Sequence, residues 1–137
     1  MNELQLQIEE LKKKIVPEYW KSIDVGEGWY RLVIDCDKEL TGVDPNYQIY
    51  QVKEKFGGLR YYVKPSDPND KDISERIASI ISKYEEIASK TCSATGGPGV
   101  LMKSIGGWLK TLNPEHAAST LHYAKYSDAR ETTKDTE

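Results

Sequence analysis

Apolar residues recur at the three- and four-residue spacing of an amphipathic helix in four segments of the chain. The first of these helices should stop before Pro17, and the second should end at Gly42. Asp72 and Glu75 resemble a capping box at the start of the third, and Asn113 is expected as the N-cap of the fourth. The helices predicted from this spacing cover residues 2–15, 28–41, 72–90 and 114–130.

Aromatic and β-branched residues are concentrated in two pairs of short segments, and each pair predicts a β-hairpin. The first pair, 47–56 and 59–64, flanks two consecutive glycines, which are a strong turn signal. The second pair comprises residues 100–104 and 107–112. The order of elements is then α-α-β-β-α-β-β-α. It predicts an α+β fold in which antiparallel hairpins pack against amphipathic helices.

The length of 137 residues favours one domain, expected over residues 1–130 with a disordered tail at 131–137. A formal net charge of -3 argues against a general nucleic-acid coat protein, but it leaves room for a local basic patch. No apolar run approaches the roughly 20 residues of a membrane span, and the N-terminus lacks the pattern of a signal peptide. We therefore expect a cytoplasmic protein without membrane contact, in which Cys36 and Cys92 are free thiols.

The first hairpin separates two kinds of side chain onto its two faces. If Gly57 and Gly58 are the turn residues, Lys55 lies opposite Arg60, and side chains alternate between the faces. The face expected to pack on the helices carries Val52, Glu54, Phe56, Leu59, Tyr61 and Val63. The other face carries Lys53, Lys55, Arg60, Tyr62 and Lys64.

Like charges directly opposite one another destabilise a sheet, so something should offset the cations on this second face. Carboxylates of the protein's own helices could do so, with Asp35, Asp37 and Glu39 as candidates. A bound anion could also do so, because arginine offers a planar fork to phosphate and lysine a point charge. The candidate ligand-binding residues are Lys53, Lys55, Gly57, Gly58, Arg60 and Tyr62.

A second pattern resembles half of a metal site. Cys92 and Thr95 have the spacing of a C-x2-C pair, and Asn113 and His116 that of a C-x2-H pair. A structural zinc site needs four nitrogen or sulfur ligands, and threonine and asparagine replace two of them poorly. Cys36 or His122 could complete a set, although nothing in the sequence places either nearby. We therefore expect neither a bound metal nor a cofactor.

Four segments of the chain are similar to a family of small bacterial, prophage and phage proteins: GWY (28–30), VKEKFGGLRYYV (52–63), TCSATGGPG (91–99) and GGWLKTLNPEHA (106–117). Members of this family share a KEKFGGLRFY-like hairpin, and many carry a C-x2-C…C-x2-H end like that of a zinc ribbon. The resemblance covers roughly residues 25–118. It implies the same fold, with two of the four zinc-ribbon ligands replaced here, and it implies no established activity.

The sequence lacks the common catalytic motifs, so a non-enzymatic binding protein is expected. The preferred hypothesis is a phage-type protein that antagonises a bacterial defence system by binding an anionic, nucleotide-like ligand on the basic hairpin face. One alternative is a protein–protein inhibitor of a defence effector such as a CRISPR nuclease, anchored by Trp20, Trp29 or Trp108. Another is a degenerate zinc-ribbon module that binds DNA. The phage setting implies the cytoplasm of the host cell, and homo-oligomerisation stays open.

Overall fold

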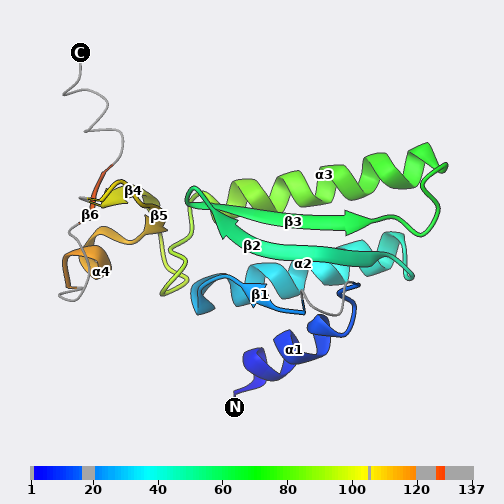
Figure 1. The fold of residues 1–137 in the computed structure, drawn as a ribbon, viewed down its shortest axis with the longest axis horizontal. Helices are drawn as coiled ribbons and strands as arrows, with labels where there is room; N and C mark the ends of the chain where they lie inside the picture. Colours follow the sequence, from blue (N-terminus) through cyan, green and yellow to red (C-terminus); the bar gives the residue numbers. More distant parts are fainter. Residues whose placement is uncertain (1, 17–20, 105, 120–125, 129–137) are drawn as a thin grey trace.

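The computed structural model of the protein describes residues 2–16, 21–104, 106–119 and 126–128. It has the α+β architecture expected from the sequence, with two three-stranded sheets (Figure 1). The elements in chain order are α1 (Glu3–Lys12), β1 (Ile23–Asp24), η2 (Glu27–Trp29), α2 (Tyr30–Val43), β2 (Gln48–Lys55), β3 (Gly58–Lys64), α3 (Lys71–Ala88), β4 (Val100–Ser104), β5 (Leu109–Leu112), α4 (Pro114–Ser119) and β6 (Tyr126–Asp128). None of the helices among the described residues is long and apolar enough to cross a membrane.

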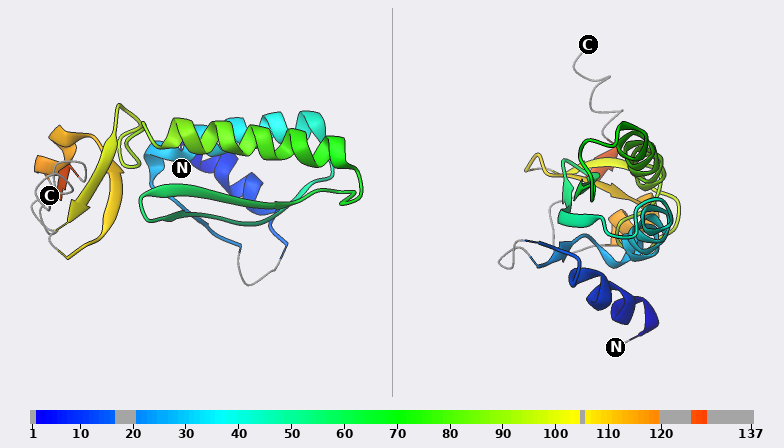
Figure 2. Two further views of the ribbon diagram at one scale, coloured as in Figure 1. Left: turned by 90° about the horizontal axis from the view of Figure 1, so that it is seen from above. Right: turned by 90° about the vertical axis from the view of Figure 1, so that its right-hand side faces the viewer.

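The first sheet has the strand order β1-β2-β3 and is covered by helices on one face. β1 runs parallel to β2, and β2 pairs antiparallel with β3. Helices α1, α2 and α3 lie side by side on the same face of this sheet, as the end-on view shows (Figure 2). Within the described residues no helix covers the opposite face, which is the basic face of the hairpin.

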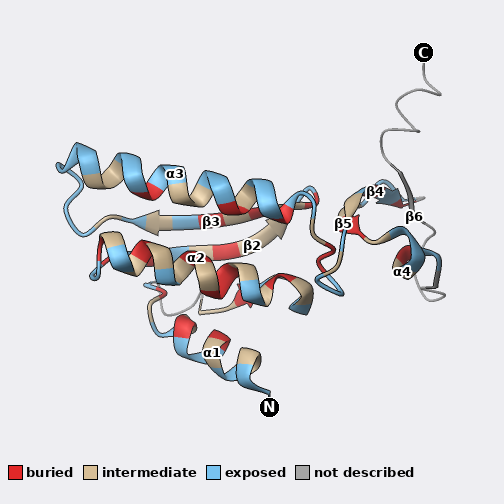
Figure 3. Ribbon diagram, turned by 180° about the vertical axis from the view of Figure 1, so that it is seen from behind, coloured by how far each residue is buried: buried red, intermediate tan, exposed pale blue. Residues whose placement is uncertain are grey.

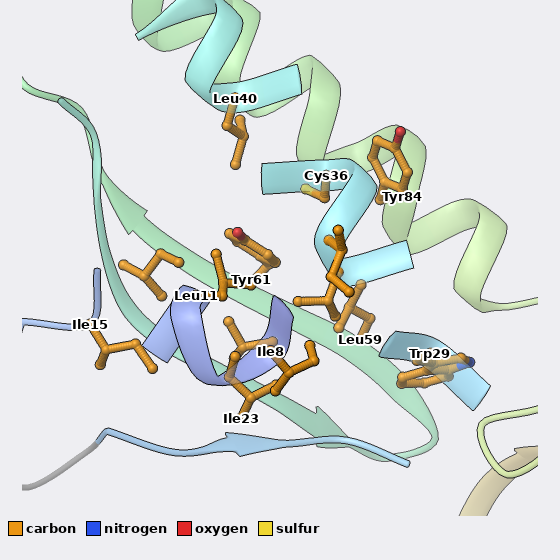
Figure 4. Packing of buried hydrophobic residues seen from close by; sticks show 14 of the residues in the cluster. Ile8, Leu11, Ile15, Ile23, Trp29, Cys36, Leu40, Leu59, Tyr61 and Tyr84 are labelled. Atoms are coloured by element: carbon orange, nitrogen blue, oxygen red, sulfur yellow. The ribbon is translucent and has the colours of Figure 1, made fainter. Parts of the chain in front are cut away.

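The main core lies between these helices and the sheet. The helices turn their buried positions toward the strands and leave their outer surfaces exposed (Figure 3). Leu40 of α2, Val52 of β2 and Leu59 of β3 are almost completely buried there, and Ile8 and Leu11 bring α1 onto the same cluster (Figure 4). Cys36 is a buried member of the cluster, so its pKa is raised to about 12, first by burial and then by the charge of Glu39. It therefore acts as a small core residue rather than as a thiolate nucleophile.

A chain of polar contacts ties the turn after α1 to α2 and to the hairpin. Lys14 donates to Asp37 of α2 at 2.7 Å, and the Tyr47 hydroxyl donates to the same carboxylate oxygen at 2.5 Å. The Tyr47 and Tyr61 hydroxyls lie 2.8 Å apart. Because burial raises the pKa of both tyrosines above the ordinary value, they stay neutral and act as hydrogen-bonding groups.

The second sheet, with the order β5-β4-β6, lies beyond the β2–β3 turn at one end of the first sheet (Figure 1). Its own small cluster comprises Cys92, Met102, Leu112 and Ala117. The two parts meet where the loop before α2 approaches the segment after α3. There the amide of Gly28 donates to Ser93 O at 2.9 Å, and Trp29 Nε1 donates to Thr91 O at 2.8 Å.

The hairpin turn is displaced by one residue from the predicted one. Lys55 pairs with Gly58, so the turn residues are Phe56 and Gly57, with φ of 53° and 78°. Positive φ at both positions is the requirement of a type I′ turn, which favours glycine at the second position. Each pairing therefore shifts by two residues and every strand residue keeps its predicted face. Only Phe56 leaves the core face, and it is 71% exposed.

Three further boundaries differ from the sequence-based prediction. Asp70, rather than Asp72, is the N-cap of α3, and its side chain accepts from the Ile73 amide at 3.1 Å. The predicted last helix does not reach residue 130, because residues 126–128 form strand β6. Strand β1 was not predicted at all, because two residues are too few to show an alternating pattern. The predicted disordered tail, 131–137, lies outside the described residues.

The contact between the two parts of the chain should depend on Gly28. A Cβ at this position would lie 2.3 Å from Cys92 O and 2.5 Å from Gly96 N, so Gly28→Ala forces two backbones apart. We expect a loss of about 1–3 kcal/mol in the free energy of unfolding, measured by urea titration of tryptophan fluorescence. Gly42→Ala is the matched control, because nothing lies within 4 Å of its Cβ position in α2. There a gain of about 0.5–1 kcal/mol is expected. A Gly28→Ala protein as stable as the parent would contradict this account.

A second prediction concerns Asp44, which follows α2 and accepts from the Ser66 amide at 2.8 Å and the Ser66 hydroxyl at 2.6 Å. Burial opposes ionisation, but the hydrogen bonds from Ser66 and from the Asn46 backbone together outweigh it and hold the pKa of Asp44 below its ordinary value. Asp44→Ala should therefore lower the free energy of unfolding by about 1–3 kcal/mol at pH 7. This stabilisation is present above the unfolded pKa of about 3.9 and is lost as the pH falls through the folded pKa. Urea titrations of both proteins from pH 7 to pH 3 should show their difference in unfolding free energy shrink below about pH 4. A difference that does not change with pH would contradict this prediction.

Candidate ligand-binding face and groove

The basic face is the uncovered side of the hairpin and carries Lys53, Lys55, Arg60, Tyr62 and Lys64. Lys53 of β2 lies directly opposite Arg60 of β3, so the facing pair of cations contains Lys53 rather than the predicted Lys55. Tyr62 is 44% exposed one step further along β3. The structure therefore brings the predicted cations and the tyrosine to one surface.

The charges of this face are only partly compensated by the protein. Arg60 Nη1 lies 3.7 Å from a carboxylate oxygen of Glu85 on α3, with both side chains more than a third exposed. Such an exposed pair contributes little. Asp24 of β1 is the parallel neighbour of Lys53 in the sheet, and no ion pair joins the two among the described residues. The carboxylates Asp37 and Glu39, suggested by the sequence, instead pair with Lys14 and Lys83 in the helix layer.

The two glycines of the motif have different surroundings. Gly57 is buried, its carbonyl accepts from the Thr111 hydroxyl at 2.7 Å, and a Cβ there would lie 2.5 Å from a methyl carbon of Leu101. Gly58 is half-buried in β3 and pairs with Lys55. Gly57 therefore holds the second sheet against the hairpin turn.

A groove of about 620 Å³ opens where the turn of the first hairpin meets the turn of the second. We call it the tip groove. Phe56 and Trp108 line it and are 71% and 75% exposed, the largest exposures among the bulky apolar side chains of the described residues. The residues that line the groove are Glu54, Lys55, Phe56, Gly57, Gly106, Gly107, Trp108, Leu109 and Lys110.

Sequence reasoning missed this groove because it placed Phe56 on the core face of the hairpin. No local signal pointed to the observed turn, because Gly-Gly is favoured at the two central positions and positive φ is strained at a bulky residue such as Phe56. Trp29, the other tryptophan that follows a glycine in the sequence, is fully buried. Trp20 lies outside the described residues.

Local hydrogen bonds join the positions that resemble a zinc ribbon in two groups. Cys92 Sγ accepts from the Thr95 amide at 3.4 Å, and Asn113 Oδ1 accepts from the amides of Glu115 and His116 at 3.0 and 3.4 Å. Burial raises the pKa of Cys92, but the hydrogen bonds from Thr95 and from backbone amides outweigh it and lower the pKa. In the part of the chain that the structure describes, no three His, Cys, Asp or Glu residues are grouped to hold a metal ion. His122 is not among those residues.

A scan against models of protein families, a search of curated proteins and a search of solved structures found no match to this chain.

The exposed Phe56 should lower the stability of the hairpin. A bulky residue at φ of 53° costs about 1 kcal/mol or more, and asparagine tolerates this conformation much better. We expect Phe56→Asn to raise the free energy of unfolding by about 1 kcal/mol in urea titrations. Phe56→Ala is the control, because it removes the ring and keeps the strained conformation, so it should give no gain. If Phe56→Asn instead destabilised the protein, packing of the ring would outweigh the strain.

Proposed function

We propose that this chain is a non-enzymatic binding protein that holds an anionic, nucleotide-like ligand on the basic face of its first hairpin. The observation that carries the proposal is the facing pair Lys53 and Arg60 on a sheet surface that no helix of the described chain covers. Two cations side by side on a sheet destabilise it unless an anion accompanies them. The long contact of Arg60 with Glu85 offsets this only in part.

The chemistry of the face suits a phosphorylated ligand. Arg60 offers a planar fork that matches two phosphate oxygens, and Lys53 and Lys55 add mobile point charges. Tyr62 offers a ring for stacking and a hydroxyl for hydrogen bonding. Gly58 lies in β3 between these side chains in sequence, and Gly57 lines the tip groove beside Lys55.

The proposed biological setting rests on the family resemblance of the hairpin and of the glycine-rich segments. In a phage or prophage, a protein that captures a nucleotide-like signal in the cytoplasm of the host cell would antagonise a bacterial defence system that depends on that signal. The fold supports this role to the extent that it offers a charged binding surface on a small scaffold.

The alternative of a protein–protein inhibitor is favoured by one observation. The exposed Phe56 and Trp108 are the type of aromatic anchor that dominates protein interfaces. A defence effector bound through these two rings would use the tip groove and would not need the facing cations. The two functions therefore differ in which residues they require. The degenerate zinc-ribbon module receives no comparable support from the described residues.

The test begins with native mass spectrometry of protein purified gently from a phage-challenged strain, which reports retained small molecules and subunit number together. Calorimetric titrations with ATP, GTP and tripolyphosphate then follow. Lys53→Gln and Arg60→Gln should each lower the affinity for these probes about tenfold, because each removes a charge-assisted contact. Lys38→Gln removes the same charge from the exposed surface of α2 and should leave the affinity unchanged.

Two results would overturn the proposal. One is the absence of both a retained ligand and any binding of the three probes at low salt, where charge interactions are strongest. The other is binding that Lys38→Gln weakens as much as Lys53→Gln does, since the attraction would then be non-specific. Capture of a defence effector that is lost in Trp108→Ala and kept in Lys53→Gln would favour the protein–protein inhibitor.

A further inference from the structure

The tip groove contains the parts of a base-binding site. Phe56 enters it from the turn between β2 and β3, and Trp108 from the turn between β4 and β5. Exposed aromatic rings are the surfaces on which nucleic-acid bases stack. A volume of about 620 Å³ lies within the range of small-ligand pockets. Neither ring is needed for the core, since both are mostly exposed.

Glu54 gives the groove a polar group that can select among bases. Its Oε1 is shielded from solvent and has no hydrogen-bond partner, and it lies 3.6 Å from Lys110 Nζ, which is too long for a hydrogen bond. A shielded acceptor without a donor is unfavourable. The Lys110 side chain is 44% exposed and flexible, so it can turn from the carboxylate toward a ligand phosphate and leave Glu54 open to a new donor.

The carboxylate favours one base over the others. An ionised carboxylate only accepts hydrogen bonds and offers two oxygens. Guanine presents its N1–H and its N2 amino group side by side on one edge, so both oxygens find a donor. Adenine presents an amino group beside an unprotonated ring nitrogen, which repels the second oxygen.

We propose that the tip groove binds the guanine base of a small guanine nucleotide, with Phe56 and Trp108 contacting the ring and Glu54 accepting from its donor edge. This inference rests on the proposed function and names the class of its ligand. Lys55 lines the groove and also belongs to the basic face, so it connects the base to the phosphates on Lys53 and Arg60. Lys110 adds a second cation at the mouth of the groove.

The test compares GTP, ATP and tripolyphosphate by calorimetry on the full chain. We expect GTP to bind at least tenfold more tightly than either of the others. Glu54→Gln should reduce the ratio of GTP to ATP affinity to about one, because the amide replaces one acceptor by a donor. Trp108→Ala should lower the affinity for GTP by about tenfold or more and leave the affinity for tripolyphosphate unchanged.

The outcomes separate this inference from the function on which it rests. Equal affinity for GTP and ATP, or for GTP and tripolyphosphate, overturns the guanine assignment and leaves the anion-binding face intact. If none of the three probes binds, both the guanine assignment and the proposed function are overturned. If Glu54→Gln does not fold, the exposed Trp108→Ala variant still decides the point, because undiminished GTP binding there overturns the assignment.

Discussion

The close approach of two backbone segments, the loop before α2 and the turn after α3, is the constraint on which the rest of the structure depends. At Gly26 a Cβ would lie 2.1 Å from Ser93 O, and at Gly28 it would lie 2.3 Å from Cys92 O. Only glycine permits this contact. The same docking brings Gly57 into contact with Thr111 and Leu101 of the second sheet. As a result, the turns of the two hairpins lie beside each other and the tip groove exists.

The polar network beneath the hairpin holds the sheet that carries the basic face in one position. Tyr47 and Tyr61 connect the strands to Asp37, which Lys14 also contacts, so a lysine of the turn after α1 and a tyrosine of β3 share one set of contacts. Buried polar groups that satisfy one another fix a single arrangement, whereas apolar packing alone allows several. These contacts lie on the helix-covered face and fix the position of the sheet relative to the helices. The basic face on the other side of the sheet is therefore held in place.

Much of this fold could be predicted from the sequence, because apolar periodicity and glycine-rich turns are local signals. The helices over residues 30–43 and 71–88 and both hairpins follow from them, and so does the clustering of Lys53, Arg60 and Tyr62 on one face. The register could not be predicted, because Gly57-Gly58 and Phe56-Gly57 are both possible turns and the strain of positive φ at a bulky residue argues against the second. Docking of Gly57 against Thr111 of the second sheet, 54 positions further along the chain, favours the Phe56-Gly57 turn. The tip groove depends on that docking, so no local pattern indicated it.

Three features that reduce stability lie near the turn of the first hairpin. Phe56 is a bulky residue with positive φ, Lys53 faces Arg60 across the sheet, and Glu54 has a shielded oxygen without a hydrogen bond. Each is unfavourable for the isolated fold, and each could be removed by a conservative substitution that leaves the core untouched. Proteins keep such local conflicts mainly where a site requires them. All three would be relieved or used by the ligand that we propose, an anion with a planar, hydrogen-bond-donating ring.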